Sequence, residues 1–171
     1  MGGDQPAAET LTLMTVKLSG SATAPTPLPA KLRDIADLGK PVVKKRIVLG
    51  ESMGMNSRMM TMGFLIDGKT FDMSRIDLTS RLGDVEQWEI VNKADMDHPF
   101  HIHGGQFHVT ERTRNGKSMP NSYLAWKDTV NVARGETLRL KMRQSQAGLR
   151  MYHCHILEHE DAGMMGTLNV S

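Results

Sequence analysis

Residues 152–165 read Tyr-His-Cys-His-Ile-Leu-Glu-His-Glu-Asp-Ala-Gly-Met-Met. This stretch contains the only cysteine of the chain, three of its seven histidines, and Met164, which follows the cysteine by ten residues. A soft thiolate, imidazole nitrogens and a thioether form a ligand set that favours copper over magnesium, calcium or a purely structural zinc. We therefore expect the chain to be organised around a copper site at this stretch.

A second histidine-rich stretch, residues 95–103, reads Asp-Met-Asp-His-Pro-Phe-His-Ile-His. Successive side chains of a strand point to opposite faces, so His101 and His103 are expected to bind one metal site together. His98 precedes Pro99, where we expect the chain to bend, and this bend would leave His98 free to point at a different metal. The stretch therefore predicts ligands for two metal sites.

The same alternation applies to the stretch around the cysteine. If Cys154 lies on a strand and faces one metal, His153 and His155 face the opposite side, toward another metal. The thiolate of Cys154 would then carry electrons between two copper sites through a few covalent bonds. Around Cys154, the blue-copper pattern of two histidines, a cysteine and a weak axial methionine would be completed by His98, His159 and Met164.

Short runs of alternating, β-prone residues recur along most of the chain, with turn signals between them. One run, residues 64–71, contains Asp67-Gly68 between apolar flanks, which is a strong signal for a hairpin. The other expected strands cover residues 42–49, 85–92, 106–112, 128–132, 137–142, 149–153 and 166–170. This spacing predicts an all-β fold, a β-sandwich or barrel of the Greek-key type.

The first residues of the chain have a different composition. Residues 10–18 alternate like a strand, and residues 25–29 carry proline at every second position, which suits an extended linker. Because a lone strand needs a sheet to join, we interpret residues 1–31 as the tail of a preceding domain followed by a Pro-rich linker. The domain proper is expected to cover residues 32–171 and to begin with a helical turn over residues 32–38.

Composition argues against several classes of function. The chain has 21 basic and 19 acidic residues, and its formal net charge of +2 is spread without a basic stripe, so no nucleic-acid partner is expected. No run approaches the roughly 18 apolar residues of a membrane span, and the first residues carry no recognisable secretory signal. The compartment must therefore be inferred from function.

Methionine is unusually frequent, with 14 residues in the chain. One stretch is especially rich and contains Met53, Met55, Met59, Met60 and Met62. Methionine often fills gaps in a core, which is the simpler interpretation. The polar neighbours favour the alternative hypothesis of a flexible, thioether-rich loop that binds Cu(I), because soft sulfur ligands select that ion.

Three motifs carry a resemblance to a known family: residues 98–103, residues 126–130 (Trp-Lys-Asp-Thr-Val) and residues 153–165. Together they resemble the C-terminal cupredoxin domain of multicopper oxidases and are most similar to bacterial laccases and cuprous oxidases. The resemblance covers residues 40–171, and the segment before it is similar to the end of the second domain of that family. It implies a cupredoxin-like fold and a periplasmic or secreted location, where such oxidases receive copper.

The resemblance also implies a role for each candidate ligand. The type 1 copper, which accepts single electrons from a small-molecule reductant such as a phenol or Cu(I), would be bound by His98, Cys154, His159 and Met164. His101 would bind the type 2 copper. His103, His153 and His155 would bind the paired type 3 coppers, and dioxygen is reduced to water at these three coppers. Glu160 resembles a carboxylate that relays protons to dioxygen, and its alternative interpretation is a solvated loop acid.

The number of histidines departs from the family pattern. The trinuclear cluster of the family takes eight histidines, four of them from an N-terminal domain, whereas this chain offers four and leaves His108 for a structural or surface role. Three hypotheses follow. The chain is a domain of a laccase-like oxidase that needs the missing N-terminal cupredoxin domains, a stand-alone blue-copper electron-transfer or copper-binding module, or a homo-oligomer in which another copy completes the cluster. Whether the chain alone is an active oxidoreductase stays open.

Overall fold

The computed structural model describes residues 11–20, 25–30, 33–56 and 59–171. The chain divides into two units, Met1–Asp34 and Ile35–Ser171. Within the described part of the first unit, residues 11–18 form no strand and have no neighbouring strand, so the strand predicted over residues 10–18 as part of a preceding domain stays a prediction, and Thr10 lies outside the described residues. The physical reason is that a strand needs a neighbour to satisfy its backbone N–H and C=O groups.

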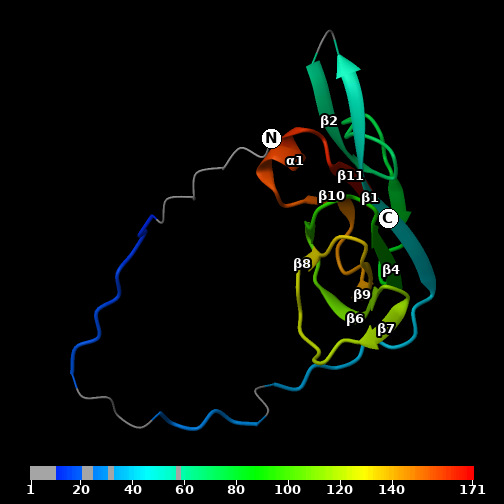
Figure 1. Cartoon of the computed structure of the whole chain (residues 1–171). Coiled ribbons are helices and arrows are strands. Elements are labelled where there is room, and N and C mark those ends of the chain that lie inside the picture. Colours follow the sequence, from blue (N-terminus) through cyan, green and yellow to red (C-terminus); the bar gives the residue numbers. More distant parts are fainter. Residues whose placement is uncertain (1–10, 21–24, 31–32, 57–58) are drawn as a thin grey trace. The chain divides into compact units, whose positions relative to one another are not determined.

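The second unit contains two β-sheets (Figure 1). The first sheet has the order β2-β1-β4-β9-β6-β7 and consists of β1 (Val43–Asn56), β2 (Met59–Ile66), β4 (Val85–Asn92), β6 (Phe107–Arg114), β7 (Lys117–Pro120) and β9 (Thr137–Arg143). The second has the order β3-β11-β10-β5-β8 and consists of β3 (Leu78–Ser80), β5 (His98–Ile102), β8 (Thr129–Val132), β10 (Gly148–Cys154) and β11 (Met165–Val170). One short helix, α1 (Leu157–Asp161), connects β10 to β11.

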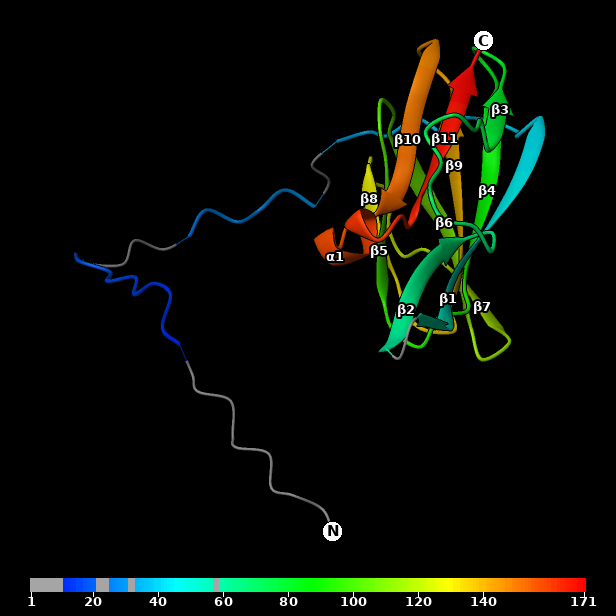
Figure 2. The same cartoon turned by 90° about the horizontal axis from the view of Figure 1, so that it is seen from above.

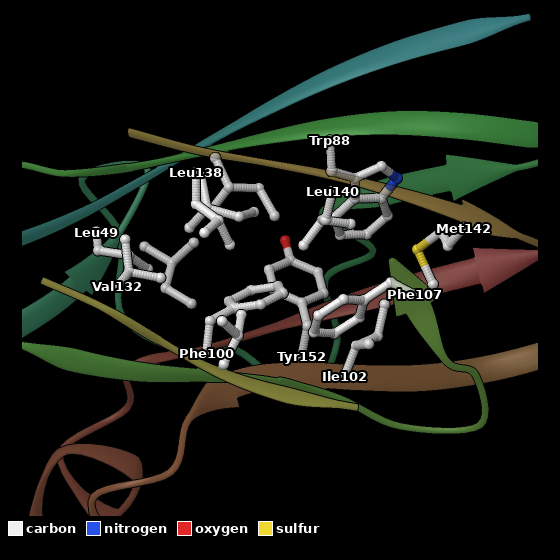
Figure 3. Close-up of a cluster of buried hydrophobic side chains, with 14 of the residues drawn as sticks. Leu49, Trp88, Phe100, Ile102, Phe107, Val132, Leu138, Leu140, Met142 and Tyr152 are labelled. Atoms are coloured by element: carbon white, nitrogen blue, oxygen red, sulfur yellow. The ribbon is translucent and has the colours of Figure 1, made fainter. Parts of the chain in front are cut away.

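The core lies between the two sheets and is formed by alternate residues of the facing strands. Figure 3 shows Trp88, Leu138 and Leu140 of the first sheet opposite Phe100 and Tyr152 of the second. The rings of Trp88 and Tyr152 meet edge to face, with their centroids 5.9 Å apart. Full burial of each such side chain stabilises the fold by roughly 1.5–3 kcal/mol, so these residues hold the two sheets together.

The two histidine-rich stretches lie next to each other in the second sheet. Strand β5 pairs with β10 in an antiparallel register that places His101 opposite His153 and Phe100 opposite Cys154. Helix α1 follows the end of β10, next to the beginning of β5 (Figure 2). Residues that are far apart in the sequence therefore meet at one end of the sandwich.

The predicted all-β, cupredoxin-like sandwich of the Greek-key type is confirmed. Strand β4 begins and ends where predicted, and most other strands predicted between residues 42 and 170 form within about two residues of their expected bounds. The exceptions are β1, which continues to Asn56 instead of ending at Leu49, and residues 64–71. There the Asp67-Gly68 turn forms, but beyond it only a single bridge joins Ile66 to Lys69. Strand β2 pairs instead with β1, which offers a longer run of backbone partners.

Two further predictions are wrong within the described residues. Residues 33–38 contain no helical turn, and residue 32 lies outside the described part of the chain. Residues 53–56 and 59–62 do not form a loop, because they belong to the antiparallel hairpin of β1 and β2, in which Met53 lies opposite Met62. This hairpin extends beyond the rest of the sandwich in Figure 1.

Candidate metal centre

Three candidate ligand atoms converge in the interior of the second unit. The Sγ atom of Cys154 lies 3.4 Å from Nδ1 of His98 and 3.6 Å from Nδ1 of His159. The two Nδ1 atoms lie 3.2 Å from each other. The relative exposure of Cys154 and His98 is 0%, and that of His159 is 4%. We name these three residues the buried cluster.

Local structure explains why these three side chains meet. Cys154 is the last residue of β10, and His159 lies in α1, which follows immediately. His98 begins β5 and shares its core-facing side with Phe100. The expected bend at Pro99 is wrong, since Pro99 lies within β5 opposite Asn131. His98 and His101 point to different sides because they are three residues apart on one strand.

Met164 is fully buried and reaches the cluster through its backbone. The N–H of Cys154 donates to the carbonyl of Met164 at 3.1 Å, and the N–H of Met164 donates to the carbonyl of His159 at 2.9 Å. These two bonds close the loop between β10 and β11. Met164 and Cys154 both belong to the main core. The structure therefore places all four predicted residues of the first site in one region.

The electrostatics of the buried cluster suit a metal ion. Burial lowers the pKa of His98 and His159 below the ordinary value of 6.5, and the neighbouring His159 lowers the pKa of His98 further. Burial raises the pKa of the Cys154 thiol. Neutral imidazoles can bind a metal directly, whereas the thiol must lose a proton when it does so. The soft sulfur and two imidazole nitrogens, aimed at one point, fit copper.

Four other histidines gather on the opposite side of β10. The Nε2 atoms of His103 and His153 lie 2.9 Å apart. The ring of His101 lies 5.0 Å from that of His103, 5.2 Å from that of His153 and 5.4 Å from that of His155, measured between centroids. His153 is buried, His101 is half-buried, and His103 and His155 are exposed. We name this set the surface cluster.

Neighbouring groups orient the rings of the surface cluster. Nδ1 of His101 lies 3.0 Å from the carbonyl oxygen of Asp128 and 2.8 Å from Oγ1 of Thr129. Nδ1 of His153 lies 3.0 Å from the carbonyl oxygen of Cys154 and 3.3 Å from Oε2 of Glu160. Metal-binding histidines usually donate their second ring N–H to such acceptors. Both residues therefore have Nε2 available for a ligand.

The surface cluster opens into a cavity of 620 Å³. Its lining includes His101, His103, Trp126, Asp128 and Arg143. Partial desolvation lowers the pKa of both His101 and His103 from the ordinary value of 6.5, which favours the unprotonated imidazoles. A group that enters the cavity can thus meet unprotonated histidine nitrogens.

His108 belongs to neither cluster. Its relative exposure is 1%, and its ring lies 3.9 Å from that of Trp126 between centroids. The surface role considered for His108 is therefore wrong, and its position is a structural one in the packing of β6. Neither ring nitrogen of His108 has a hydrogen-bond partner among the described residues.

Two residues near the buried cluster were not predicted from the sequence. Oε1 of Glu51 lies 3.8 Å from Nε2 of His98, and the ring of Phe64 stacks on that of His159 with centroids 3.6 Å apart. Glu51 and Phe64 are cross-strand partners in the hairpin of β1 and β2. The signal for them was the pairing of two strands, which a sequence pattern does not contain. Thr129 lies in a quoted motif, but its contact with His101 was not anticipated.

Comparison with known proteins agrees with this arrangement. The family model described as multicopper oxidase matches residues 44–171. The chain is 41% identical over 135 residues to the multicopper oxidase mco of Staphylococcus haemolyticus (strain JCSC1435), covering 77% of this chain and 28% of that protein. It is 33% identical over 110 residues to a laccase of Bacillus subtilis (strain 168), covering 54% of this chain and 21% of that protein.

A solved structure is also similar to this chain. It is a multicopper oxidase from Campylobacter jejuni, described as a metallo-oxidase, with a TM-score of 0.79 and 44% sequence identity. The match covers 86% of this chain and 34% of that one. The chain thus spans 28% of the length of the first relative and 34% of this structure. On the match of the family model over residues 44–171, the chain belongs to the multicopper oxidase family.

Proposed function

We propose that this chain is a copper-binding domain of a laccase-like multicopper oxidase, with a complete type 1 site and half of a trinuclear site. The convergence of Cys154 Sγ and the Nδ1 atoms of His98 and His159 within 3.2–3.6 Å is the observation that carries this proposal. Met164 is the proposed weak axial ligand, supported by its burial and by its backbone bonds to Cys154 and His159.

Copper bound at these residues would supply one-electron redox chemistry. Cys154 has His153 and His155 as its direct chain neighbours, so its side chain is linked to the surface cluster by covalent bonds alone. In the proposal, His98 and His159 hold the buried site, and Cys154 conducts an electron to the surface cluster. Burial keeps water away from Cys154 and His98, each with a relative exposure of 0%.

The surface cluster would hold the other half of the chemistry. His101 is proposed for the type 2 position, and His103, His153 and His155 for the type 3 positions. Their four imidazoles are half of the eight in the family pattern, and the cavity beside them leaves space for the others. N-terminal cupredoxin domains are the proposed source. There are two alternatives. A second copy of this chain supplies the missing histidines, or the chain is a stand-alone electron-transfer module that needs none.

Glu160 is proposed to move protons. Its Oε2 atom lies 3.3 Å from Nδ1 of His153, and its side chain is 30% exposed. One face of the carboxylate thus contacts the surface cluster while the other meets solvent, which suits a group that passes protons inward. Replacement of Glu160 by Gln would keep the size of the side chain and remove this capacity.

The reductant is proposed to approach at the hairpin. A pocket beside Glu51 is lined by Met53, Met62, Lys93 and Asp95. The relative exposure of Met53 is 74% and that of Met62 is 50%, so these thioethers are accessible rather than part of the core. The accessible thioethers of Met53 and Met62 favour Cu(I) over a phenol as the electron donor, because soft sulfur ligands select that ion.

The location is also proposed from chemistry. In the described residues, no helix has the length and apolar character needed to cross a membrane. Copper loading and removal of Cu(I) by this family take place outside the cytoplasm, which supports a periplasmic or secreted protein. Fractionation of cells that produce the native protein would test this location.

Copper loading tests the central proposal. The chain incubated with Cu(II) is expected to develop an intense blue thiolate-to-copper absorption band, and the Cys154→Ser variant is expected to lack it. A Met164→Leu variant should keep the band with a changed shape, because the axial ligand is weak. A colourless parent chain that binds copper as well as Cys154→Ser would refute the type 1 assignment.

Oxygen uptake separates the three sources of the missing histidines. The monomeric chain should not reduce dioxygen, whereas addition of N-terminal domains should restore turnover. Turnover by the pure chain, with light scattering that shows an oligomer, would favour the second copy.

Replacement of the methionines of the hairpin by leucine should lower Cu(I) oxidation in the reconstituted enzyme but spare phenol oxidation. Equal loss of both activities would favour a packing role for these methionines. The methionines concerned are Met53, Met55, Met59, Met60 and Met62.

A further inference from the structure

Phe64 reaches the buried cluster from a hairpin that contributes none of its ligands. Its ring lies parallel to that of His159, with an interplanar angle of 18° and a centroid distance of 3.6 Å. The same ring meets His98 edge-on at 6.4 Å. Phe64 is half-buried and packs against the main core, which also contains Cys154 and Met164. One aromatic side chain thus touches both imidazoles of the cluster.

The pairing of β1 with β2 explains how Phe64 arrives there. Residues directly opposite each other in an antiparallel pair project to the same face, and alternate residues along each strand share that face. The successive pairs on this face are Leu49 with Ile66, Glu51 with Phe64, and Met53 with Met62. The first pair is buried in the core, the second contacts the imidazoles, and the third is exposed. A single face of the hairpin therefore connects the core, the cluster and solvent.

Among the described residues, no side chain other than Phe64 stacks on the ring of His159. Within the same part of the chain, its ring hydrogen-bonds only with the facing atoms of Cys154 and His98, which would be fellow ligands. In the surface cluster, by contrast, Asp128 and Thr129 hold the ring of His101 from behind. A five-residue helix carries His159, and a helix of this length gives little rigidity alone. Stacking is what holds the plane of this ring.

We propose that Phe64 is a positioning residue for the type 1 copper: it fixes the plane of the His159 imidazole and couples the methionine-bearing hairpin to the metal. This inference rests on the proposed function, because it concerns the same site. The stacked ring also excludes water from one face of His159. Since Cu(II) carries more charge than Cu(I) and gains more from water, this exclusion raises the reduction potential of the site.

The test compares three variants of the full chain loaded with Cu(II). Phe64→Leu keeps an apolar side chain but removes the stack, and Phe64→Tyr keeps the aromatic ring. Leu65→Ala is the matched control, because Leu65 is adjacent on β2, lies opposite Gly50 and faces the other side of the hairpin. The readouts are the blue absorption band, the copper hyperfine coupling in electron paramagnetic resonance, and the reduction potential. None of them depends on oxidase turnover.

Phe64→Leu is expected to lower the reduction potential and shift both spectra, while Phe64→Tyr restores the parent values and Leu65→Ala leaves them unchanged. Spectra and potential of Phe64→Leu that coincide with those of the parent would overturn the proposal. An equal shift in Leu65→Ala would also overturn it, because the effect would then come from general loosening of the hairpin.

A copper-free measurement separates this inference from the proposed function. In the apo chain, the face of Phe64 should move the ring proton signals of His159 upfield in NMR spectra, and Phe64→Leu should remove this shift. If the parent binds no blue copper but the ring shift is present, the type 1 assignment fails while the stack stands. If Phe64→Leu leaves the His159 signals unchanged, the positioning role fails whatever the metal does.

Discussion

The buried cluster and the surface cluster use the same residue type in opposite surroundings. The candidate ligand atoms of His98, Cys154 and His159 meet inside one domain, and these residues have relative exposures between 0% and 4%. His103 and His155 of the surface cluster are exposed, and a cavity of 620 Å³ lies beside the set. A site enclosed by one core can be complete within one chain, whereas a site at a surface can be completed only by another surface.

The two clusters are also held in different ways. Two rings of the surface cluster are oriented by polar groups: His101 Nδ1 hydrogen-bonds with the Asp128 carbonyl and the Thr129 hydroxyl, and His153 Nδ1 lies 3.3 Å from the Glu160 carboxylate. Apolar packing and the Phe64 stack enclose the buried cluster. Polar support tolerates water, which suits a site beside a cavity. Apolar support excludes water, which suits a site that exchanges only electrons.

Removal of one histidine from each cluster in turn should produce the largest difference in blue copper binding. His98→Ala is expected to abolish blue copper binding, a loss beyond the roughly 10–100-fold that removal of an outer partner causes. His103→Ala should leave the blue band intact and weaken only the binding of further metal. Metal titration followed by absorption checks both variants. Equal loss of the blue band in both would contradict the separation into two sites.

Removal of the core residue opposite Cys154 should destabilise the fold far more than removal of an exposed aromatic side chain. Phe100 has a relative exposure of 0% and lies opposite Cys154 in the β5–β10 pair. Phe100→Ala is expected to lower the free energy of unfolding of the copper-free chain by about 3–5 kcal/mol. Tyr123, which is 58% exposed, is the control, and Tyr123→Ala should change the same quantity by less than about 0.5 kcal/mol. Urea unfolding measures both, and similar losses would argue against a shared core.

Acid should destabilise the copper-free chain through its buried histidines. The pKa values of His98 and His159 are lowered in the folded state by burial, so the unfolded chain binds more protons. Their stabilising contribution is therefore present above the ordinary value of 6.5 and is lost as the pH falls through their folded pKa values. Glu86 and Glu136, whose pKa values are lowered from 4.5, contribute to acid unfolding only at lower pH.

The measurement is urea unfolding of the apo chain between about pH 7 and pH 5, where histidine titrates and carboxylates do not. His98→Gln should flatten the dependence of the unfolding free energy on pH more than His103→Gln, because His98 is fully buried and His103 is exposed. A greater flattening in His103→Gln would show that burial is not the dominant cause.

Removal of the Thr129 hydroxyl, which orients His101, should produce the smallest effect on metal binding. Thr129→Val deletes the Oγ1 atom that lies 2.8 Å from Nδ1 of His101 but leaves the Asp128 carbonyl in place. Metal affinity of the surface cluster should fall by about 10-fold, the lower end for an outer partner. Calorimetric titration in a Cys154→Ser background isolates this cluster, and Thr110→Val on β6 is the control. No change in affinity would mean that Asp128 alone orients His101.

Local patterns predicted most of the fold and the candidate site. Alternation of side chains was sufficient to place His101 with His103 and to separate Cys154 from His153 and His155. His98 was assigned to the other metal through a bend at Pro99 that does not form. The prediction at Pro99 was wrong because proline usually interrupts a strand. Here Pro99 lies in β5, between β10 and β8, and its carbonyl accepts a hydrogen bond from the N–H of His155. The loop predicted for the methionine-rich stretch was also wrong. Its polar neighbours are typical of a loop, but the stretch forms two paired strands.

The sequence by itself determined the chemistry of this protein: one cysteine, its histidines and a methionine at spacings that divide them between two sides of a strand. The tertiary structure decided which site is enclosed, which residues support it, and that Glu51 and Phe64 meet the imidazoles. The physical reason is that the direction of a side chain along a strand is a local property. The register between strands distant in the sequence depends on packing of the whole core, and no local pattern contains it.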